Sequence, residues 1–352
     1  MNIPPHYRFP GEFEPHRATW MMWPSRPDNW RCNAYFGQHD TLALAALISH
    51  FEPVRLAAQP SEVNKLRRQA PPSVAIVPMS YNDTWVRDTG PTTVVAPNAP
   101  PIAVDWKFNS WGGLFSDASE DDGVAAEIAA YENMKTIRAP IVLEGGAIIS
   151  DGKGTLITTE EAVLADNRNP GLTRSEAEQI FRHYLNVENV VWLAAGLAHD
   201  ESGGHVDNMC AFAAHGVVLI ATTPDHAHPS FERCRIALET IRSAKSVGGT
   251  HYLIQEVPLP DATSITEWEA KGFDPPHGII VRAAGSPLAP SHVNLCITNA
   301  AVFVPTFNCF SDGEAVTKIG AAFPDRCVVP YKSREFLLGG GAIHCLTKEI
   351  PS

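Results

Sequence analysis

The sequence lacks several features that would mark particular classes of protein. No apolar run reaches the roughly 18 residues of a membrane span, and the best run, LALAALI at 42–48, is typical of a core helix. The seven cysteines include no CxxC pair and give no disulfide framework. Basic residues are not in excess either. The net charge of −12 therefore argues against nucleic acid as a partner.

The chain also lacks a visible export signal and an internal linker. The opening segment, MNIPPHYRFPGEFEPHR, has no apolar stretch of the signal-peptide kind. We therefore expect a cytoplasmic, reducing location. With 44% hydrophobic and 19% charged residues, the composition is that of a globular protein. We expect one catalytic domain over residues 1–352. Six cysteines occur in no polar cluster, and most are expected to be buried apolar residues: Cys32, Cys210, Cys234, Cys296, Cys309 and Cys327.

One pattern recurs five times, although its letters differ. A polar, glycine-bearing segment opens a strand, a turn follows, and then a second strand. The copies are RDTGPTTVVAP (87–97), LEGGAIISDGKGTLITT (143–159), GGHVDNMCAFAAHGVVLIAT (203–222), SHVNLCITNAAVFVPTF (291–307) and LGGGAIHCLTKEI (338–350). DGKG and AAHG are favourable hairpin turns.

Helical patterns alternate with these units. They cover 40–51, 119–134, 173–185 and 228–244, and the third begins with a capping-box signal, Thr173 and Glu176. The alternation predicts an α/β fold of five similar modules that could close around one axis, with each opening directed at the centre.

The unusual residues fall on these openings. Asp88, Glu144, His205, Asp207 and Cys345 come from four of the five units. Ionisable groups collected from several strand ends are how a site is usually built on a repeated scaffold. We therefore predict that these five residues form the site.

Cys345 is the candidate nucleophile, and it needs a base and an orienting group. His205 is the better partner, because His344 is adjacent in sequence and would face away if both lie in a strand. His205 and Asp207 form H-x-D, which on a strand places both side chains on one face.

The carboxylates of this set predict a negative pocket, because no lysine accompanies them. Crowded buried carboxylates are costly unless they are paired, and a cationic ligand would supply the pairing. A planar guanidinium fits best because its N–H donors pair bidentately with carboxylates. Cysteine attack on its carbon, with His205 protonating departing ammonia and later activating water, would convert a guanidine into a urea.

Other assignments remain open for the same residues. They could bind zinc, although close-spaced ligand pairs of the HExxH or CxxC kind are missing. A thiol protease would leave the extra carboxylates unexplained. An amidinotransferase would pass the amidine to an amine instead of water. A protein that binds guanidines without turnover would not need an intact cysteine–histidine pair.

Six of the eight tryptophans lie in the first third of the chain, at positions 20, 23, 30, 85, 106 and 111. Core packing explains most of them. A wall for an aliphatic chain or a cation is the alternative, and Trp85 is the best candidate because it precedes Asp88 by three residues.

Taken together, several blocks resemble the agmatine deiminase family of the guanidino-group-modifying (pentein) superfamily. They are TWMMWPSRPDNWR (19–31), NDTWVRDTGP (82–91), FNSWGG (108–113), LEGG (143–146), GHVDN (204–208) and GGGAIHC (339–345). The resemblance runs from near residue 10 to the end, with all blocks in order.

The resemblance implies a pseudo-fivefold α/β propeller, no cofactor, a homodimer, and hydrolysis of agmatine to N-carbamoylputrescine and ammonia. By motif, Cys345 would be the nucleophile and His205 the acid and base. Asp88 and Asp207 would bind the guanidinium, and Glu144 would orient it or His205. Further residues would shape the pocket, namely Trp85, Trp111 and the backbone of Gly339–Gly341, including Gly340.

The chain departs from the family pattern near these residues. Ala147 and Ile149 follow the glutamate block where serine and histidine are usual, and Ala342 replaces asparagine. Asp200 and Glu201 could meet the primary amine of agmatine or could form a solvated turn. A deiminase of free arginine or peptidyl arginine is therefore the alternative.

Overall fold

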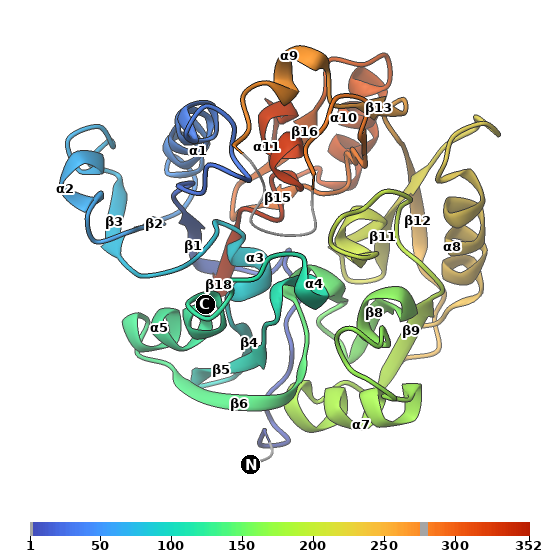
Figure 1. Ribbon diagram of the computed structural model, residues 1–352. Helices are drawn as coiled ribbons and strands as arrows, with labels where there is room; N and C mark the ends of the chain where they lie inside the picture. Colours follow the sequence, from blue (N-terminus) through green and yellow to red (C-terminus); the bar gives the residue numbers. More distant parts are fainter. Residues whose placement is uncertain (1–2, 275–280) are drawn as a thin grey trace.

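The computed structural model describes residues 3–274 and 281–352. Five sheets of three or four strands share one plan, in which an antiparallel pair is followed by a parallel pair. Their strand orders are β4-β5-β6, β7-β8-β9, β10-β11-β12, β15-β16-β17 and β18-β1-β2-β3. Figure 1 shows these sheets distributed around the middle of the molecule. The mixed sheets confirm the predicted α/β class.

The strands are short, and most are buried on both faces. Their bounds are β1 His16–Met22, β2 Val54–Ala58, β3 Val74–Pro78, β4 Thr92–Ala96, β5 Ala99–Lys107, β6 Lys135–Val142, β7 Ile148–Ser150, β8 Thr155–Thr159, β9 Asn189–Leu193, β10 Cys210–Ala214, β11 Val217–Thr222, β12 Leu253–Pro258, β15 Cys296–Ile297, β16 Ala301–Thr306, β17 Cys327–Lys332 and β18 Lys348–Pro351. A separate pair is β13 Thr263–Ser264 with β14 Pro287–Leu288. Both predicted hairpin turns are confirmed, DGKG between β7 and β8 and AAHG at the β10–β11 turn.

A helix crosses over between the parallel strands of each sheet, as parallel pairing requires. These helices are α1 Tyr35–Ile48, α5 Val124–Tyr131, α7 Arg174–Leu185, α8 Phe231–Ser243 and α10 Asp312–Ala322. The first four confirm the predicted helices with small shifts of their ends, and α7 has the expected capping box of Thr173 and Glu176. The sequence analysis did not predict α10. The shorter helices are α2 Val63–Leu66, α3 Val86–Thr89, α4 Ser110–Gly113, α6 Glu160–Val163, α9 Glu267–Ala270, α11 Arg334–Gly339 and the 3₁₀ turn η1 Asp121–Gly123.

The fifth unit is completed by the opposite end of the chain. The sequence pattern predicted two strands within 338–350, but only β18 forms there. Its antiparallel partner is β1, with Trp20 opposite Lys348 and Ala18 opposite Ile350. The first and last strands of the protein therefore share one sheet, which lies near the C-terminal label in Figure 1.

The predicted site residues lie in short turns just before strands, and the prediction that they open the strands themselves was wrong. Asp88 lies in α3, and Glu144 precedes the 3₁₀ turn η2 Gly145–Ala147. Asp207 lies in the 3₁₀ turn η3 Val206–Asn208, and His205 is the N-cap of this turn. The two side chains therefore do not share a strand face. With three residues per turn, positions i and i+2 point in different directions. Cys345 lies in a turn after α11.

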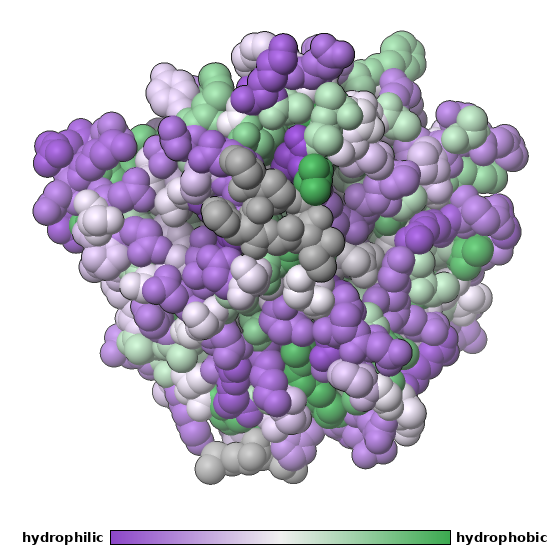
Figure 2. All heavy atoms as spheres, viewed as in Figure 1, coloured by the Kyte–Doolittle hydropathy of each residue, from purple (hydrophilic) through white to green (hydrophobic). Residues whose placement is uncertain are grey.

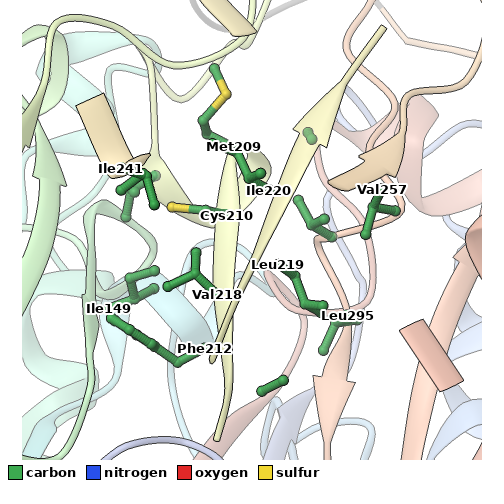
Figure 3. Packing of buried hydrophobic residues seen from close by; sticks show 14 of the residues in the cluster. Ile149, Met209, Cys210, Phe212, Val218, Leu219, Ile220, Ile241, Val257 and Leu295 are labelled. Atoms are coloured by element: carbon green, nitrogen blue, oxygen red, sulfur yellow. The ribbon is translucent and has the colours of Figure 1, made fainter. Parts of the chain in front are cut away.

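The core consists of several clusters, of which Figure 3 shows one around β10 and β11. Of the six cysteines expected to be mostly apolar and buried, Cys210, Cys234 and Cys296 are buried. The expectation was wrong for Cys32 and Cys327, which are exposed, and for Cys309, which contacts Asp312. The face in Figure 2 is largely hydrophilic, with apolar side chains in small groups.

Within residues 3–274 and 281–352, no helix has both the length and the apolar character needed to cross a membrane.

Candidate active site

The turns bring the predicted residues together. One pocket is lined by seven of them, which are Trp85, Asp88, Trp111, Glu201, Gly339, Gly340 and Cys345. Gly146 lies among Asp88, His205 and Asp207. A Cβ at this glycine would be 2.6 Å from His205 Nδ1, 2.8 Å from Asp207 Oδ2 and 2.9 Å from Asp88 Oδ1. Residue 146 must therefore lack a side chain if the three functional groups are to approach one another.

His205 is buried between two carboxylates. Its Nδ1 is 3.7 Å from Asp88 Oδ1, and its Nε2 is 3.7 Å from Glu144 Oε2. Burial alone would lower the pKa of His205, but Asp88 and Glu144 together raise it to about 9. The imidazole therefore holds a proton at neutral pH, as a group that protonates departing ammonia must.

Glu144 has a cationic partner that the sequence analysis missed. Arg168 Nε donates to Glu144 Oε1 at 2.8 Å, and both side chains are almost fully buried. Burial opposes ionisation, yet Arg168 and His205 lower the pKa of Glu144 to about 2. Arg168 lies in a loop after α6, outside the recurring motifs. No local sequence signal linked it to Glu144.

Asp88 is held by neutral donors. Gly146 N donates to Oδ1, and Trp111 Nε1 donates to Oδ2, both at 2.9 Å. Burial is the main reason that the pKa of Asp88 is raised, and the nearby carboxylates of Asp207 and Glu144 add to it. A cationic ligand beside Asp88 would reverse this effect.

Cys345 is buried, and its thiol lies beside an amide and a carboxylate. Asn294 Nδ2 is 3.2 Å from Sγ, and Asp207 Oδ2 is 3.7 Å from it. Burial first, and then the carboxylates of Asp207 and Asp88, raise the pKa of Cys345 well above its ordinary value. The resting sulfur is therefore a thiol. The SHVNL segment containing Asn294 was noted in the sequence, but Asn294 itself was not predicted to belong to the site.

Of the two candidate groups for an amine, only Glu201 faces the pocket. Its Oε1 accepts from Arg282 Nη1 at 2.6 Å, while Arg282 Nη2 donates to Asn29 Oδ1 at 2.6 Å. Asp200 instead accepts hydrogen bonds from the backbone of Ser202 and His205, at 2.9 and 3.0 Å. Asp200 is therefore a turn-forming residue.

A negative pocket was predicted because no lysine accompanies the carboxylates, but two arginines compensate part of this charge. Arg168 pairs with Glu144, and Arg282 pairs with Glu201. Asp207 Oδ2 lies 2.8 Å from His344 Nδ1. Asp88 accepts from neutral donors, as described above. The partners came from distant parts of the chain, so composition within the motifs could not reveal them.

The aromatic predictions divide between pocket and core. Trp85 stacks on Trp30, with ring centroids 5.4 Å apart, and both indoles donate to Asp83. Trp85 also lines the pocket, so its predicted position beside the site is confirmed. Trp20 and Trp106 pack in other core clusters.

The positions of the five predicted site residues give no support to the alternative that they bind zinc. Within the described residues, the three groups placed to share a metal ion are His292, Cys309 and Asp312, none of which belongs to the predicted set.

This arrangement suits cysteine chemistry on a planar cation. Asp88 and Asp207 can hold N–H groups beside the thiol of Cys345, and the protonated His205 can deliver a proton to a departing nitrogen. A guanidinium meets each requirement, since its carbon is electrophilic and its nitrogens are donors. The geometry therefore defines a class of enzyme that modifies guanidines.

The chain belongs to the Porphyromonas-type peptidyl-arginine deiminase family, whose sequence model matches residues 8–351. It is 42% identical to an agmatine deiminase of Stutzerimonas stutzeri, over 98% of this chain and 96% of that protein. It is 41% identical to one of Pseudomonas aeruginosa, with the same coverage. Among solved structures, the agmatine deiminase of Enterococcus faecalis has a TM-score of 0.96 and 36% identity, covering 99% of this chain and 96% of that chain. The resemblance to agmatine deiminases is confirmed.

Proposed function

We propose that this protein is an agmatine deiminase, which hydrolyses the guanidinium of agmatine to N-carbamoylputrescine and ammonia. One observation carries the choice of substrate. The pocket that is lined by Cys345 and Asp88 is also lined by Glu201. A ligand with a guanidinium at one end and an ammonium at the other can satisfy Asp88 and Glu201 together.

The first half of the reaction breaks a C–N bond. The cation binds against Asp88 and Asp207, which favours loss of the thiol proton of Cys345 to water. The Sγ lone pair forms a bond to the guanidinium carbon and gives a tetrahedral adduct. His205 donates its proton to one nitrogen, the C–N bond breaks, and ammonia departs. A cationic thiouronium remains on Cys345.

The second half restores the enzyme. Water loses a proton to His205 and forms a C–O bond to the thiouronium carbon. The C–S bond then breaks, its electron pair returns to sulfur, and the remaining proton on oxygen passes to that sulfur, which restores the thiol and leaves the urea carbonyl. Ammonia takes up the proton that the thiol released in the first half, so guanidinium and water give a urea and ammonium. Glu144 orients His205 throughout, because its Oε2 lies 3.7 Å from Nε2.

Free arginine is the second candidate substrate, and a specific contact favours it. Arg282 lies beside Glu201 at the same pocket and could attract a carboxylate that agmatine lacks. The pair could then receive the ammonium and carboxylate of an amino acid. Binding of agmatine instead needs only the carboxylate of Glu201.

We further propose the wider organisation that the sequence suggested. Residues 1–352 would form one catalytic domain, a pseudo-fivefold propeller of five α/β modules around the site. Support comes from the five sheets with a shared pairing plan and from the β1–β18 closure. A homodimer stays a prediction from family resemblance, which sedimentation of the purified protein would check. A cytoplasmic location stays a prediction from the opening segment, which localisation of a tagged chain would check.

The deciding experiment measures ammonia release from agmatine, arginine and an N-acylated arginine amide in parallel. We expect turnover of agmatine alone, and none with Cys345→Ala. The matched control is Cys234→Ala, which changes a buried cysteine outside the site. Turnover of arginine with agmatine inert would overturn the substrate assignment. Ammonia release that persists without Cys345 would overturn the mechanism.

A further inference from the structure

His344, the neighbour of the proposed nucleophile, makes two contacts that the reaction above does not use. Its Nδ1 lies 2.8 Å from Asp207 Oδ2, and its Nε2 lies 2.8 Å from Glu12 Oε2. The sequence analysis expected this side chain to face away from the site if it were on a strand. In the observed turn, the side chain instead contacts Asp207, one of the two carboxylates proposed to bind the substrate.

The two hydrogen bonds indicate whether the imidazole ring of His344 is neutral or protonated. A carboxylate oxygen can only accept, so each ring nitrogen must donate for both contacts to be favourable. A neutral imidazole has one donor and would direct a lone pair at one carboxylate. Glu12 also accepts from Arg87 Nη1 at 2.8 Å. Burial alone would raise the pKa of Glu12, but Arg87 and His344 hold it far below its ordinary value. The ring is therefore an imidazolium between two carboxylates.

The surrounding charges agree with this assignment. Glu12 of the N-terminal segment and Asp207 of η3 contact His344, and Arg87 of α3 acts on its charge. The ion pairs Arg87–Glu12, Arg87–Glu349 and Lys348–Glu349 extend this charge cluster to β18. Three anions face two cations until His344 carries a proton, which makes this buried cluster neutral. Burial and Arg87 lower the pKa of His344, yet the carboxylates leave it raised overall.

The contact also decides which oxygen of Asp207 remains available. Oδ2 is occupied by His344, whereas the buried Oδ1 has no hydrogen-bond partner among the described residues. The backbone of His344 is fixed on both sides, because its N donates to Asn294 Oδ1 at 3.1 Å and its O accepts from Arg87 Nε at 3.3 Å. The ring can therefore hold Asp207 in one orientation beside Cys345.

We propose that His344, as an imidazolium, is a positioning residue that keeps Asp207 turned so that Oδ1 meets the guanidinium. The proposal rests on the guanidine chemistry proposed above. His344 touches neither the substrate nor the reacting atoms, and its effect passes through Asp207. Its link to Glu12 serves to hold the proton on the ring.

Two substitutions of His344 test whether it positions Asp207 or only fills space. In His344→Asn the amide nitrogen can replace Nδ1 and still donate to Asp207, whereas in His344→Gln it can replace Nε2 and reach only Glu12. A lost hydrogen bond to a charged group is worth about 1.5–3 kcal/mol, so we expect His344→Gln to lower kcat/KM for agmatine by about 10–100-fold. His344→Asn should keep most of the wild-type kcat/KM, because its amide still donates to Asp207. Equal losses, or a larger loss for Asn, would overturn the proposal.

A measurement without turnover distinguishes this proposal from the proposed function. Iodoacetamide alkylation of Cys345 is followed with and without guanidinium chloride at a concentration that does not unfold the protein. We expect guanidinium to change the alkylation rate of the wild type and of His344→Asn at a lower concentration than that of His344→Gln, with thermal unfolding confirming that both variants fold. An inert wild type on agmatine would reject the substrate, while the same concentration dependence in all three proteins would reject the role of His344.

The protonation state can be checked in the unaltered protein. Nitrogen NMR of ¹⁵N-histidine-labelled wild type at pH 8 should show hydrogen on both ring nitrogens of His344. A neutral tautomer at that pH would overturn the proposal, whatever the variants do.

Discussion

At the scale of single residues, the site works through the placement of protons. His205 has a raised pKa of about 9 because two carboxylates flank it, whereas the pKa of Cys345 is raised by burial and by carboxylates that oppose a thiolate. The resting pair is therefore imidazolium and thiol, and not the reverse. A bound cation would favour the thiolate without removing the proton that His205 must deliver.

This arrangement predicts a pH-dependent contribution of His205 to stability. The pKa of His205 rises from the ordinary 6.5 to about 9 on folding. Its stabilising effect is therefore complete below pH 6.5 and is lost as the pH rises through 9. We expect the difference in free energy of unfolding between wild type and His205→Asn to shrink by up to about 3 kcal/mol over that window. Urea unfolding at several pH values measures it, and a constant difference would contradict the prediction.

At the scale of the element, the turn α4 stores backbone strain beside the pocket. Ser110 and Trp111 have φ values of 58° and 51°, and Gly112 and Gly113 follow with 84° and 93°. Left-handed backbone costs roughly 1–2 kcal/mol at each non-glycine residue. The turn places the indole N–H of Trp111 on Asp88 Oδ2 at 2.9 Å. The strain therefore occurs where it orients Asp88, the residue proposed to bind the guanidinium.

The two glycines of this turn allow a matched comparison. A Cβ at Gly112 would lie 2.1 Å from Asn167 Nδ2, whereas one at Gly113 would meet nothing within 4 Å. Gly113→Ala should cost only the left-handed strain, about 1–2 kcal/mol. Gly112→Ala should cost more and should also raise KM for agmatine, because the turn must shift. Chemical unfolding and steady-state kinetics of both variants test this, and equal effects would show that the contact with Asn167 is unimportant.

At the scale of the whole molecule, the pairing of the last strand with the first closes one sheet. β18 pairs with β1, and its residues Lys348 and Glu349 belong to the buried charge cluster around Arg87. The nucleophile precedes this strand by three residues. The position of Cys345 therefore depends on contacts between the two ends of the chain.

Removal of residues 348–352 tests that dependence. The shortened chain keeps every predicted catalytic residue, but it leaves Arg87 without Glu349 and exposes the edge of β1. We expect loss of cooperative unfolding and of ammonia release. Ser352→Ala is the control, because this exposed residue lies beyond β18. A truncated protein that melts cooperatively and turns over agmatine would show that closure is dispensable.

The sequence by itself determined the chemistry and the class of fold. Asp88, Glu144, His205, Asp207 and Cys345 could be selected because each belongs to a recurring glycine-bearing motif, and local patterns also located four of the crossover helices. These features depend on neighbours in the chain. Short-range preferences and residue chemistry were therefore enough to predict them.

Only the tertiary structure decided how the charges are compensated and how the side chains are aimed. Arg168 and Arg282 act on the site from loops without a motif, Asn294 contacts Cys345 from a recurring segment in which it was not selected, and Glu12 contacts His344 although more than three hundred residues separate them. The motifs also form helical turns, and not strand ends, because the backbone must carry several side chains toward Gly146. Electrostatic energy depends on distance in space, and sequence separation carries no information about it.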